Sequence, residues 1–221
     1  MSELCLAGVE FMGENLKDKV AFWGKGVRCF PLSKIIHPET AKLDNYCEIF
    51  DFVFIDAGYG LTVGKYSTIC WHALIEGGER TFIGDRVFIA PGAKIINTTG
   101  QLHGYYSVPH LPLGGHKVIR GDVIIEDDAY IGANSIIMPG VRIGEGAVIG
   151  ANSFVKKDIE PWSIYVGTPC KKIGEREKPS DEIRSKVERD VNWDNRLYDF
   201  SMPRIPAYEE LGNWQIWSDN E

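Results

Sequence analysis

The stretch from residue 119 to residue 158, IRGDVIIEDDAYIGANSIIMPGVRIGEGAVIGANSFVKKD, repeats one pattern every six residues. An aliphatic side chain stands at each sixth position: Ile119, Ile125, Ile131, Ile137, Ile143, Ile149 and Val155. A small or β-branched residue stands two places before each of these from Ile125 onward. Asp, Asn or Gly stands three places after each, from Asp122 to Asp158. Asp, Asn and Gly tolerate a left-handed backbone conformation at low cost. The pattern therefore predicts short strands with an inward aliphatic side chain, separated by tight turns.

This spacing excludes the simpler folds. Apolar residues six apart do not stay on one face of a helix with 3.6 residues per turn. Strands and turns this short cannot pair with their sequence neighbours as hairpins. Each strand must instead pair with the strand three hexads later, which is the arrangement of a parallel β-helix with a triangular cross-section.

The same register extends upstream in three trios: Leu43, Ile49 and Ile55; Val63, Ile69 and Ile75; Ile83, Ile89 and Ile95. The step between trios is eight rather than six, so each extra pair of residues falls at the same corner of the prism. The long gap between Ile95 and Ile119 falls at that corner too, and predicts a projecting loop over residues 97–117. Loops of this length are uncommon unless they are functional or disordered.

Length and charge narrow the class of protein further. The chain has 221 residues, a formal net charge of −7 and a pI near 5.3, which suits one domain with an appendage and argues against a nucleic-acid partner. The first twenty residues match neither a secretion signal nor a membrane span, so we expect a cytoplasmic protein. Five scattered cysteines support neither disulfides nor a zinc site.

The stretch from residue 123 to residue 173, which ends in WSIYVGTPCKKI, resembles the final coils and exit segment of the hexapeptide-repeat acyltransferases. This family includes galactoside, maltose and xenobiotic acetyltransferases and sugar acetyltransferases of polysaccharide clusters. The resemblance implies an all-β fold, a left-handed parallel β-helix with a projecting loop and a short C-terminal helical extension. We expect an N-terminal segment at 1–34, the β-helix at 35–175, and a helix with an aromatic tail at 176–221.

The resemblance also implies an activity. Members of this family transfer an acyl group, usually acetyl, from coenzyme A to a hydroxyl or amine, at sites between the subunits of a homotrimer. We therefore expect an acetyl-CoA-dependent O- or N-acetyltransferase that needs no metal. Its acceptor is expected to be a sugar or sugar nucleotide in surface polysaccharide biosynthesis, and an antibiotic is the alternative acceptor.

A loop histidine is the expected general base, because an imidazole with a pKa near 6.5 can take the proton of an attacking hydroxyl. His103 occupies a place in the projecting loop similar to that of the family's loop histidine. His72 is the second candidate for the base, or else a turn residue with a left-handed backbone. We expect His72, Tyr105 and Tyr130 to contact the acceptor.

The coenzyme A contacts of the family carry over to five residues of this chain. Ala133 and Ala151 are expected to stack on successive coils, where small side chains let the backbone approach the pantetheine amides. The exit segment adds three lysines that are expected to meet the nucleotide phosphates: Lys156, Lys157 and Lys171.

Two other functions fit the same scaffold. A metal hydrolyase of the γ-carbonic anhydrase kind needs three converging histidines, for which the chain offers His72, His103, His110 and His116, but without that family's histidine spacing. A noncatalytic repeat scaffold would use the flat faces and the tail. In the tail, Ser180 is expected to cap a helix with Ile183, Val187 and Val191 on one side, followed by Trp193, Trp214 and Trp217.

Overall fold

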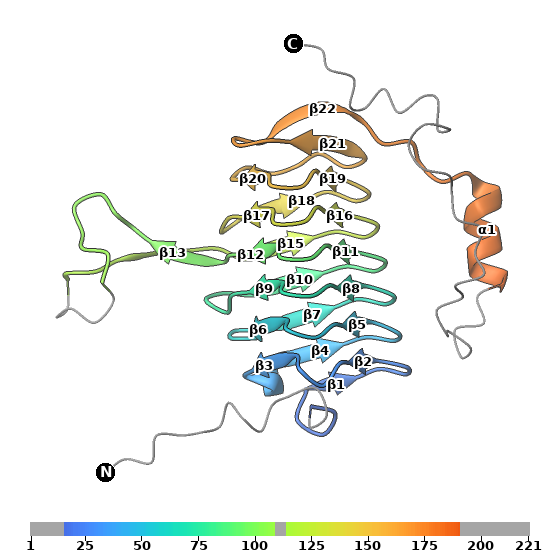
Figure 1. Ribbon diagram of the computed structural model, residues 1–221, viewed down its shortest axis with the longest axis horizontal. Coiled ribbons are helices and arrows are strands. Elements are labelled where there is room, and N and C mark those ends of the chain that lie inside the picture. The colour runs from blue at the N-terminus through green and yellow to red at the C-terminus, as the bar shows by residue number, and fades with distance from the viewer. Residues whose placement is uncertain (1–15, 109–113, 191–221) are drawn as a thin grey trace. The chain divides into compact units, whose positions relative to one another are not determined.

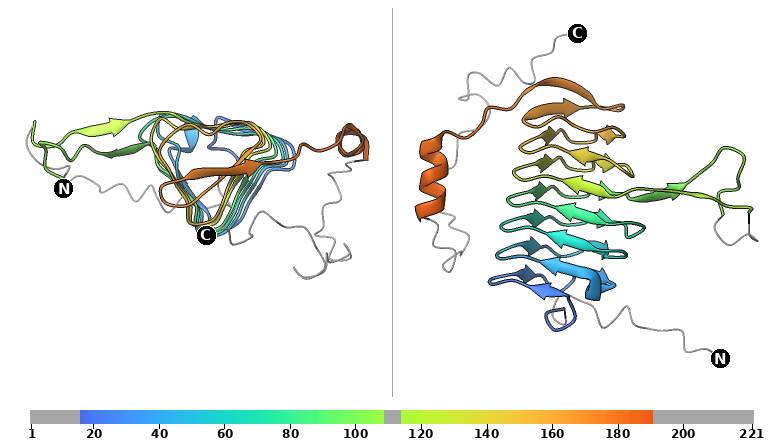
Figure 2. Two further views of the ribbon diagram at one scale, coloured as in Figure 1. Left: turned by 90° about the horizontal axis from the view of Figure 1, so that it is seen from above. Right: turned by 180° about the vertical axis from the view of Figure 1, so that it is seen from behind.

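The structure is a computed structural model that describes residues 16–108 and 114–190, with side chains as far as residue 185 in the last helix. The chain divides into two compact units, residues 1–177 and 178–221. The first unit is a parallel β-helix whose coils stack as triangular rungs (Figures 1 and 2). The all-β fold class predicted from the hexads is confirmed.

Each rung contributes one short strand to each of three faces. The first face consists of β1 (Phe22–Trp23), β4 (Ala41–Leu43), β7 (Leu61–Val63), β10 (Thr81–Ile83), β15 (Val123–Ile125) and β18 (Arg142–Ile143). The second face consists of β2 (Arg28–Cys29), β5 (Glu48–Ile49), β8 (Thr68–Ile69), β11 (Phe88–Ile89), β16 (Tyr130–Ile131), β19 (Val148–Ile149), β21 (Ser163–Val166) and β22 (Lys171–Glu175). The third face consists of β3 (Lys34–Ile36), β6 (Phe54–Asp56), β9 (Leu74–Ile75), β12 (Lys94–Ile95), β17 (Ile136–Ile137) and β20 (Phe154–Val155).

The aliphatic residue of each hexad points into the prism and stacks on its counterparts above and below. On the first face, Ile83 is opposite Val63 in one neighbouring strand and Ile125 in the other. All three side chains are fully buried. Burial of apolar surface in this continuous column is the main stabilising contribution to each coil.

The turns follow the predicted pattern at most positions. Left-handed φ angles occur at Asp128, Asn134, Gly140, Gly146 and Asn152, each three residues after an inward aliphatic. Neither Asp122 nor Asp158 adopts this conformation. Both residues lie at the corner between the third and first faces, where the regular turn is replaced by the projecting hairpin before Asp122 and by a step of only four residues, from Val155 to Ile159, around Asp158.

The prediction that Ile119 opens the run of inward aliphatics is wrong. Ile119 lies in β14 (Val118–Arg120), which pairs antiparallel with β13 (Thr98–Gly100), and its side chain is 45% exposed. These two strands form a hairpin that projects from the coil, as Figure 1 shows. The projecting segment therefore extends to the end of β14 rather than ending at residue 117, and the next inward position is in β15.

The β-helix has a coil upstream of the first trio read from the sequence. β1, β2 and β3 form this coil, and Trp23, Cys29 and Ile35 are aligned with Leu43, Ile49 and Ile55 of the next. Trp23 and Cys29 pack against the core and keep the step of six. A search limited to aliphatic residues missed them because one is aromatic and the other is a cysteine.

Helix is confined to two short elements of the described residues, the 3₁₀ turn η2 (Pro38–Thr40) and α1 (Asp181–Asp190). In α1, the backbone N–H of Ile183 donates to the Oγ of Ser180 at 3.3 Å, which is the predicted cap. Val191 and the three tail tryptophans lie outside the described residues. No helix in residues 16–108 and 114–190 is long and apolar enough to cross a membrane.

Candidate active site

Ala133 and Ala151 lie one above the other at the turn between the second and third faces, which we call the alanine corner. The backbone N–H of Asn152 donates to the carbonyl oxygen of Ala133 at 2.8 Å, so the two turns are in direct contact. Ala151 is exposed and Ala133 is half-buried. Because both side chains are small, an extended ligand with amide groups can approach the backbone of two successive coils here.

His72 lies at the same corner, two coils below Ala133. The N–H of Gly92 donates to the carbonyl of Trp71 at 3.0 Å, and the N–H of Asn134 donates to the carbonyl of Pro91 at 3.0 Å. These bonds link the coils of His72 and Ala133 through one intervening turn. His72 has a left-handed φ of 60°, and its exposed ring stacks on Phe52 with centroids 5.2 Å apart. The turn role that the sequence allowed for His72 is therefore present in the backbone.

The three predicted lysines surround one pocket near the C-terminal end of the β-helix. Lys156, Lys157 and Lys171 line a pocket of about 380 Å³. Phe154, Tyr165 and Cys170 are among the less polar side chains that line it. The three lysines form no ion pair within the described residues. Three unpaired ammonium groups around one pocket form a site that suits an anionic group.

Lys172, the next lysine along the chain, differs from these three because it forms ion pairs. The Nζ of Lys172 lies 2.6 Å from carboxylate oxygens of both Glu160 and Glu175. These hydrogen bonds raise the pKa of Lys172 above its ordinary value. Lys172 is therefore neutralised by its own neighbours, whereas the three pocket lysines are available to a ligand.

His103 and Tyr105 lie on the projecting hairpin, in the connection between β13 and β14. His103 is exposed, and the Nζ of Lys117 lies 5.6 Å from the ring centroid of Tyr105. The hairpin leaves the β-helix where the chain passes from the third face to the first, which we call the loop corner. His103 therefore lies away from the surface of the coils. Of the other predicted site residues, only Tyr105 lies on the same hairpin.

A buried amide fixes the root of the hairpin. Asn97 is fully buried, and its Oδ1 accepts from the N–H of Gly78 at 2.7 Å. Its Nδ2 donates to the carbonyl of Glu79 at 2.7 Å and to the Oγ1 of Thr81 at 3.1 Å. A satisfied buried network of this kind rigidifies the segment that it holds. Sequence reasoning missed Asn97, although it directly follows the last hexad before the loop.

Tyr130 lies on the second face, three residues before Ala133 in the same coil. Its ring is 40% exposed and stacks on Phe88 of the coil below, with centroids 5.4 Å apart. It therefore borders the alanine corner rather than the hairpin.

The predicted residues thus form two groups at different corners of one chain. His72, Ala133 and Ala151 share the alanine corner, whereas His103 and Tyr105 are carried by the hairpin from the loop corner. The end-on view in Figure 2 shows the hairpin leaving one vertex of the triangle. The third face lies between the two corners, so the two groups do not meet within one β-helix.

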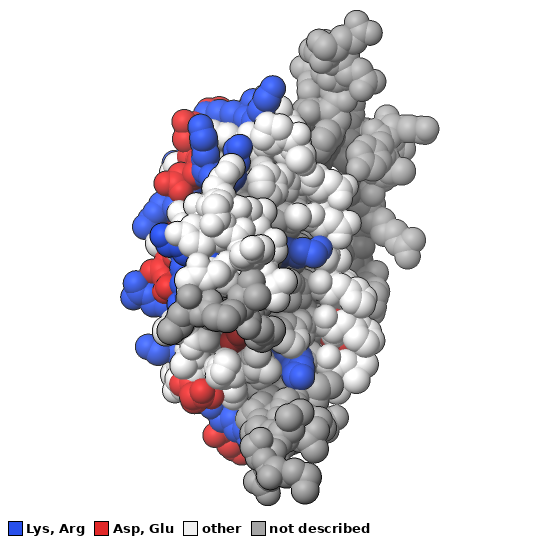
Figure 3. Space-filling model, turned by 90° about the vertical axis from the view of Figure 1, so that its left-hand side faces the viewer, with Lys and Arg blue, Asp and Glu red and all other residues white. Residues whose placement is uncertain are grey.

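The third face is largely uncharged on its outer side. Its outward side chains are Lys34, Phe54, Leu74, Lys94, Ile136 and Phe154. Figure 3, seen from the side of the hairpin, shows charged side chains gathered along one margin and few elsewhere on this side. A face with four apolar side chains in one row is suited to burial against another protein surface.

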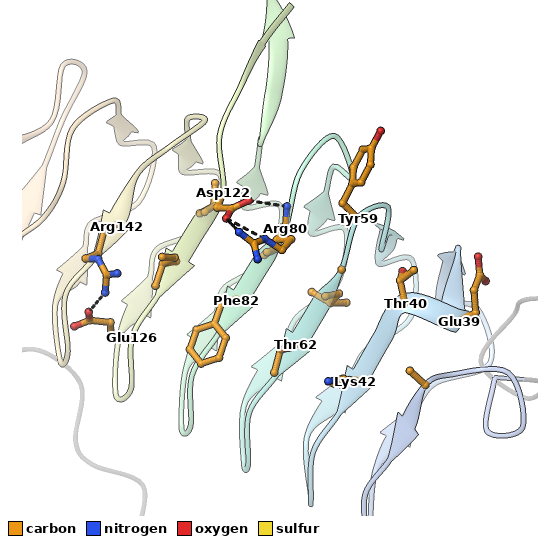
Figure 4. A pocket seen from close by; sticks show the side chains of 16 residues that line it. Glu39, Thr40, Lys42, Tyr59, Thr62, Arg80, Phe82, Asp122, Glu126 and Arg142 are labelled. Atoms are coloured by element: carbon orange, nitrogen blue, oxygen red, sulfur yellow. Dashed lines mark hydrogen bonds and ion pairs between the residues drawn. The ribbon is translucent and has the colours of Figure 1, made fainter.

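A groove lies over the first face and contains none of the predicted site residues. It has a volume of about 850 Å³ and is lined by Lys42, Phe82 and two ion pairs, Arg80 with Asp122 and Arg142 with Glu126 (Figure 4). The hydrogen bond from Arg80 lowers the pKa of Asp122 below its ordinary value. The charged side chains that line the groove are largely neutralised by these ion pairs, so we do not place the reaction in this groove.

The metal-hydrolyase alternative requires clustered ligands. Within residues 16–108 and 114–190, no three His, Cys, Asp or Glu side chains converge as a metal site would require. His110, one of the four histidines considered for such a site, lies outside the described residues.

Comparison with known proteins identifies the family. A family model described as "Hexapeptide repeat of succinyl-transferase" matches residues 122–157. The dTDP-4-amino-4,6-dideoxy-D-glucose acyltransferase of Escherichia coli is 33% identical over 192 residues, which cover 85% of this chain and 93% of that protein. The chain belongs to the hexapeptide-repeat acyltransferases. The acyltransferase activity predicted from the sequence is therefore confirmed at the level of the enzyme class.

Other acyltransferases are similar to this one in sequence or in structure. A chloramphenicol acetyltransferase of Agrobacterium fabrum is 35% identical over 183 residues, 71% of this chain and 87% of that protein. AntD, an N-acyltransferase from Bacillus cereus solved with dTDP and 3-hydroxybutyryl-CoA, has a TM-score of 0.75 at 31% identity and covers 83% of this chain and 98% of its own. A hexapeptide-repeat acetyltransferase of Vibrio cholerae, at 22% identity and a TM-score of 0.56, shares the fold.

The structure shows an aromatic cluster at the alanine corner that sequence reasoning missed. Trp71, beside His72, is 45% exposed and contacts Phe50, which in turn stacks on Phe30. Phe52 and His72 form a second stack. Aromatic residues one coil length apart were the available signal, because residues at that spacing lie one above the other in a β-helix.

Proposed function

We propose that this acyltransferase transfers an acyl group from acyl-CoA to the amine of a dTDP-linked amino sugar. The observation that carries the proposal is the alignment of small residues at the alanine corner, between a lysine-lined pocket at one end of the β-helix and His72 toward the other. The named substrates of the Escherichia coli relative and the dTDP and acyl-CoA bound to AntD support this acceptor and donor class. The family resemblance favours a role in surface polysaccharide biosynthesis.

The lysine pocket sets the direction of the donor. Phosphates carry the charge of coenzyme A, so its nucleotide end belongs beside Lys156, Lys157 and Lys171. The pantetheine arm would then run down the alanine corner, with its amides against the backbone at Ala151 and Ala133. The thioester is thereby directed toward the coils that carry His72.

The chemistry requires one nucleophilic attack and one proton transfer. The nitrogen lone pair of the acceptor amine attacks the thioester carbonyl carbon, and an N–C bond forms as the carbonyl oxygen becomes an oxyanion. The C–S bond then breaks as the carbonyl re-forms, and the thiolate of coenzyme A leaves. We assign His103 to accept the proton from nitrogen and deliver it to the departing sulfur.

The separation of the two corners supports a site shared between copies. We propose a homotrimer in which the hairpin of one copy reaches the alanine corner of the next, with the apolar side chains of the third face buried between them. An interface of this kind would give each thioester one imidazole from the adjacent chain. The oligomer is cyclic in this arrangement, so every copy both gives and receives a hairpin.

We also propose that the acyltransferase works in the cytoplasm. Cys29, Cys47, Cys70 and Cys170 are free thiols, which persist best in a reducing compartment.

Thiol release from acetyl-CoA tests the proposed reaction. The acceptor panel contains dTDP-linked amino sugars, the same sugars with a hydroxyl in place of the amine, and chloramphenicol. We expect release only with the amino sugars, and a loss of about 100-fold or more in kcat for His103→Ala. Leu102→Ala, at the neighbouring exposed position, is the matched control and is expected to stay within a factor of two or so.

The same panel tests a second candidate function. Identity to the chloramphenicol acetyltransferase favours an antibiotic acceptor, which reacts through a hydroxyl. Release with chloramphenicol and with no amino sugar would replace the proposed acceptor. Unchanged turnover in His103→Ala on a good acceptor would remove the base assignment and make His72 the next residue to substitute.

A further inference from the structure

The aromatic cluster at the alanine corner has a preformed and solvent-accessible surface. The indole of Trp71 is 45% exposed and lies against Phe50 with ring centroids 4.6 Å apart. Phe50 is itself only 6% exposed and stacks on Phe30 at 4.7 Å. Phe50 therefore supports the indole from within the protein at an interplanar angle of 58°, while the exposed part of the indole is open to a planar ligand.

A second pair of rings flanks the indole. Phe52 is 54% exposed and is parallel to the imidazole of His72, with an interplanar angle of 8°. Trp71 and His72 are adjacent in one turn, and their partners Phe50 and Phe52 lie in the same turn of the preceding coil. We call these four side chains, Phe50, Phe52, Trp71 and His72, the aromatic platform.

The platform lies in line with the proposed donor track. Trp71 is at the same turn position as Pro91, Ala133 and Ala151 of the coils above it, as the backbone hydrogen bonds between these turns show. Neighbouring coils are about 4.8 Å apart, so Trp71 lies about 10 Å below Ala133. A donor whose phosphates are at the lysine pocket therefore ends near the platform, and a group bound there would belong to the acceptor.

A lysine side chain is held beside the platform. The Nζ of Lys94 donates to the carbonyl oxygen of Gly92 at 3.1 Å, and the N–H of Gly92 donates to the carbonyl of Trp71 at 3.0 Å. Lys94 forms no ion pair within the described part of the chain. A half-buried ammonium group whose contact is a neutral carbonyl retains the charge needed to bind a phosphate.

We propose that Trp71 and Lys94 form the subsite for the nucleotide part of the acceptor. The nucleobase stacks on the exposed indole, and the diphosphate is neutralised by the Lys94 ammonium group. Aromatic stacking combined with a nearby cation is the chemistry that recognises a nucleotide. This inference rests on the proposed function, and it assigns the residues that would distinguish a nucleotide-linked sugar from a free sugar.

Binding of dTDP alone to the full-length protein tests the subsite by isothermal titration calorimetry. We expect Trp71→Ala to raise the Kd for dTDP by about tenfold or more, the range of one lost base stack. Trp71→Phe is expected to recover part of the affinity, because it keeps an aromatic face. Lys94→Met is expected to weaken dTDP binding and to reduce its dependence on salt.

The controls separate a nucleotide subsite from other roles of the same rings. Phe82→Ala removes a ring of similar exposure, 46%, from the first face, and it is expected to leave dTDP binding unchanged. The Kd of Trp71→Ala for coenzyme A is expected to match wild type. Size-exclusion chromatography with light scattering checks that Trp71→Ala keeps the wild-type mass.

Each contrary result has a distinct meaning. If wild-type protein binds no dTDP, the proposed acceptor class fails and this subsite fails with it. If wild type binds dTDP and Trp71→Ala binds it equally well, the subsite assignment alone is overturned. A fall in molecular mass for Trp71→Ala also overturns the assignment, because the platform is then a subunit contact.

Discussion

The inward isoleucines and the isoleucine of the hairpin test how position determines the contribution of one residue to stability. Ile131 is fully buried, whereas Ile119 is 45% exposed although it continues the same step of six. We expect Ile131→Ala to reduce the free energy of unfolding by about 2–5 kcal/mol, because it leaves a cavity between coils. Ile119→Ala is expected to change it by about 0.5 kcal/mol or less. Urea denaturation compares the two, and equal losses would contradict the assigned inward register.

His37 and Asp56 give the first two coils a link that depends on pH. The Nδ1 of His37 lies 2.8 Å from the Oδ1 of Asp56, and this hydrogen bond raises the pKa of the imidazole above its ordinary value. A raised folded-state pKa adds stability at pH values below about 6.5, and that stability is lost as the pH rises through the folded-state pKa. An NMR titration should give a His37 pKa above about 6.5 that falls toward this value in Asp56→Asn. An identical pKa in the two proteins would exclude the link.

The hexad pattern predicted most of the inward residues of the β-helix correctly, but it misassigned Ile119 and missed Trp23. The hexad rule located Ile125, Ile131 and their successors because one physical requirement, an aliphatic side chain in a narrow prism, acts at every step. It included Ile119 because a β-branched residue also suits the strand of a hairpin. It omitted Trp23 because it counted only aliphatic residues, and the first coil has an aromatic side chain at the inward position.

At the scale of the element, the hairpin is separable from the coils that it interrupts. β10 pairs with β15 and β12 pairs with β17 across the insertion, so the register continues above and below it. Replacing residues 98–120 by a short glycine-containing turn, with Asn97 kept, should leave the β-helix folded. We expect little change in the circular dichroism spectrum or the Tm, and a loss of activity of about 100-fold or more, because the base is removed. Loss of the β-sheet spectrum would show that the hairpin is needed for folding.

The elements also explain which parts of the site were predictable. The positions of Ala133 and Ala151 follow from the repeat, because equal hexads place equal positions at one corner. The convergence of Lys171 on Lys156 and Lys157 depends on β22, which reverses direction and pairs antiparallel with β21. No hexad specifies that reversal, so the pocket was indicated only by family resemblance. The aromatic platform depends on side-chain contacts between coils, which the hexad rule does not consider.

At the scale of the whole molecule, the two corners provide different parts of the proposed site. The alanine corner provides the donor track, and the hairpin at the loop corner provides the proposed base. The third face separates the corners, so the hairpin's imidazole and the thioester track meet only if two copies pack together. The shortage of charge on that face reduces the desolvation cost of burying it. The arrangement predicts that neither half of the site is sufficient within one chain.

Mixing two inactive variants tests this division directly. His103→Ala removes the proposed base but keeps the donor track, and Ala133→Trp blocks the track but keeps the hairpin. Unfolding and refolding the two together in equal amounts should restore about a quarter of wild-type activity, because a site works only when its hairpin comes from Ala133→Trp and its track from His103→Ala, one of four equally frequent combinations. The double variant His103→Ala with Ala133→Trp, refolded with itself, is the matched control and should remain inactive. Mixed oligomers that show no gain over the separate variants would place the whole site within one chain.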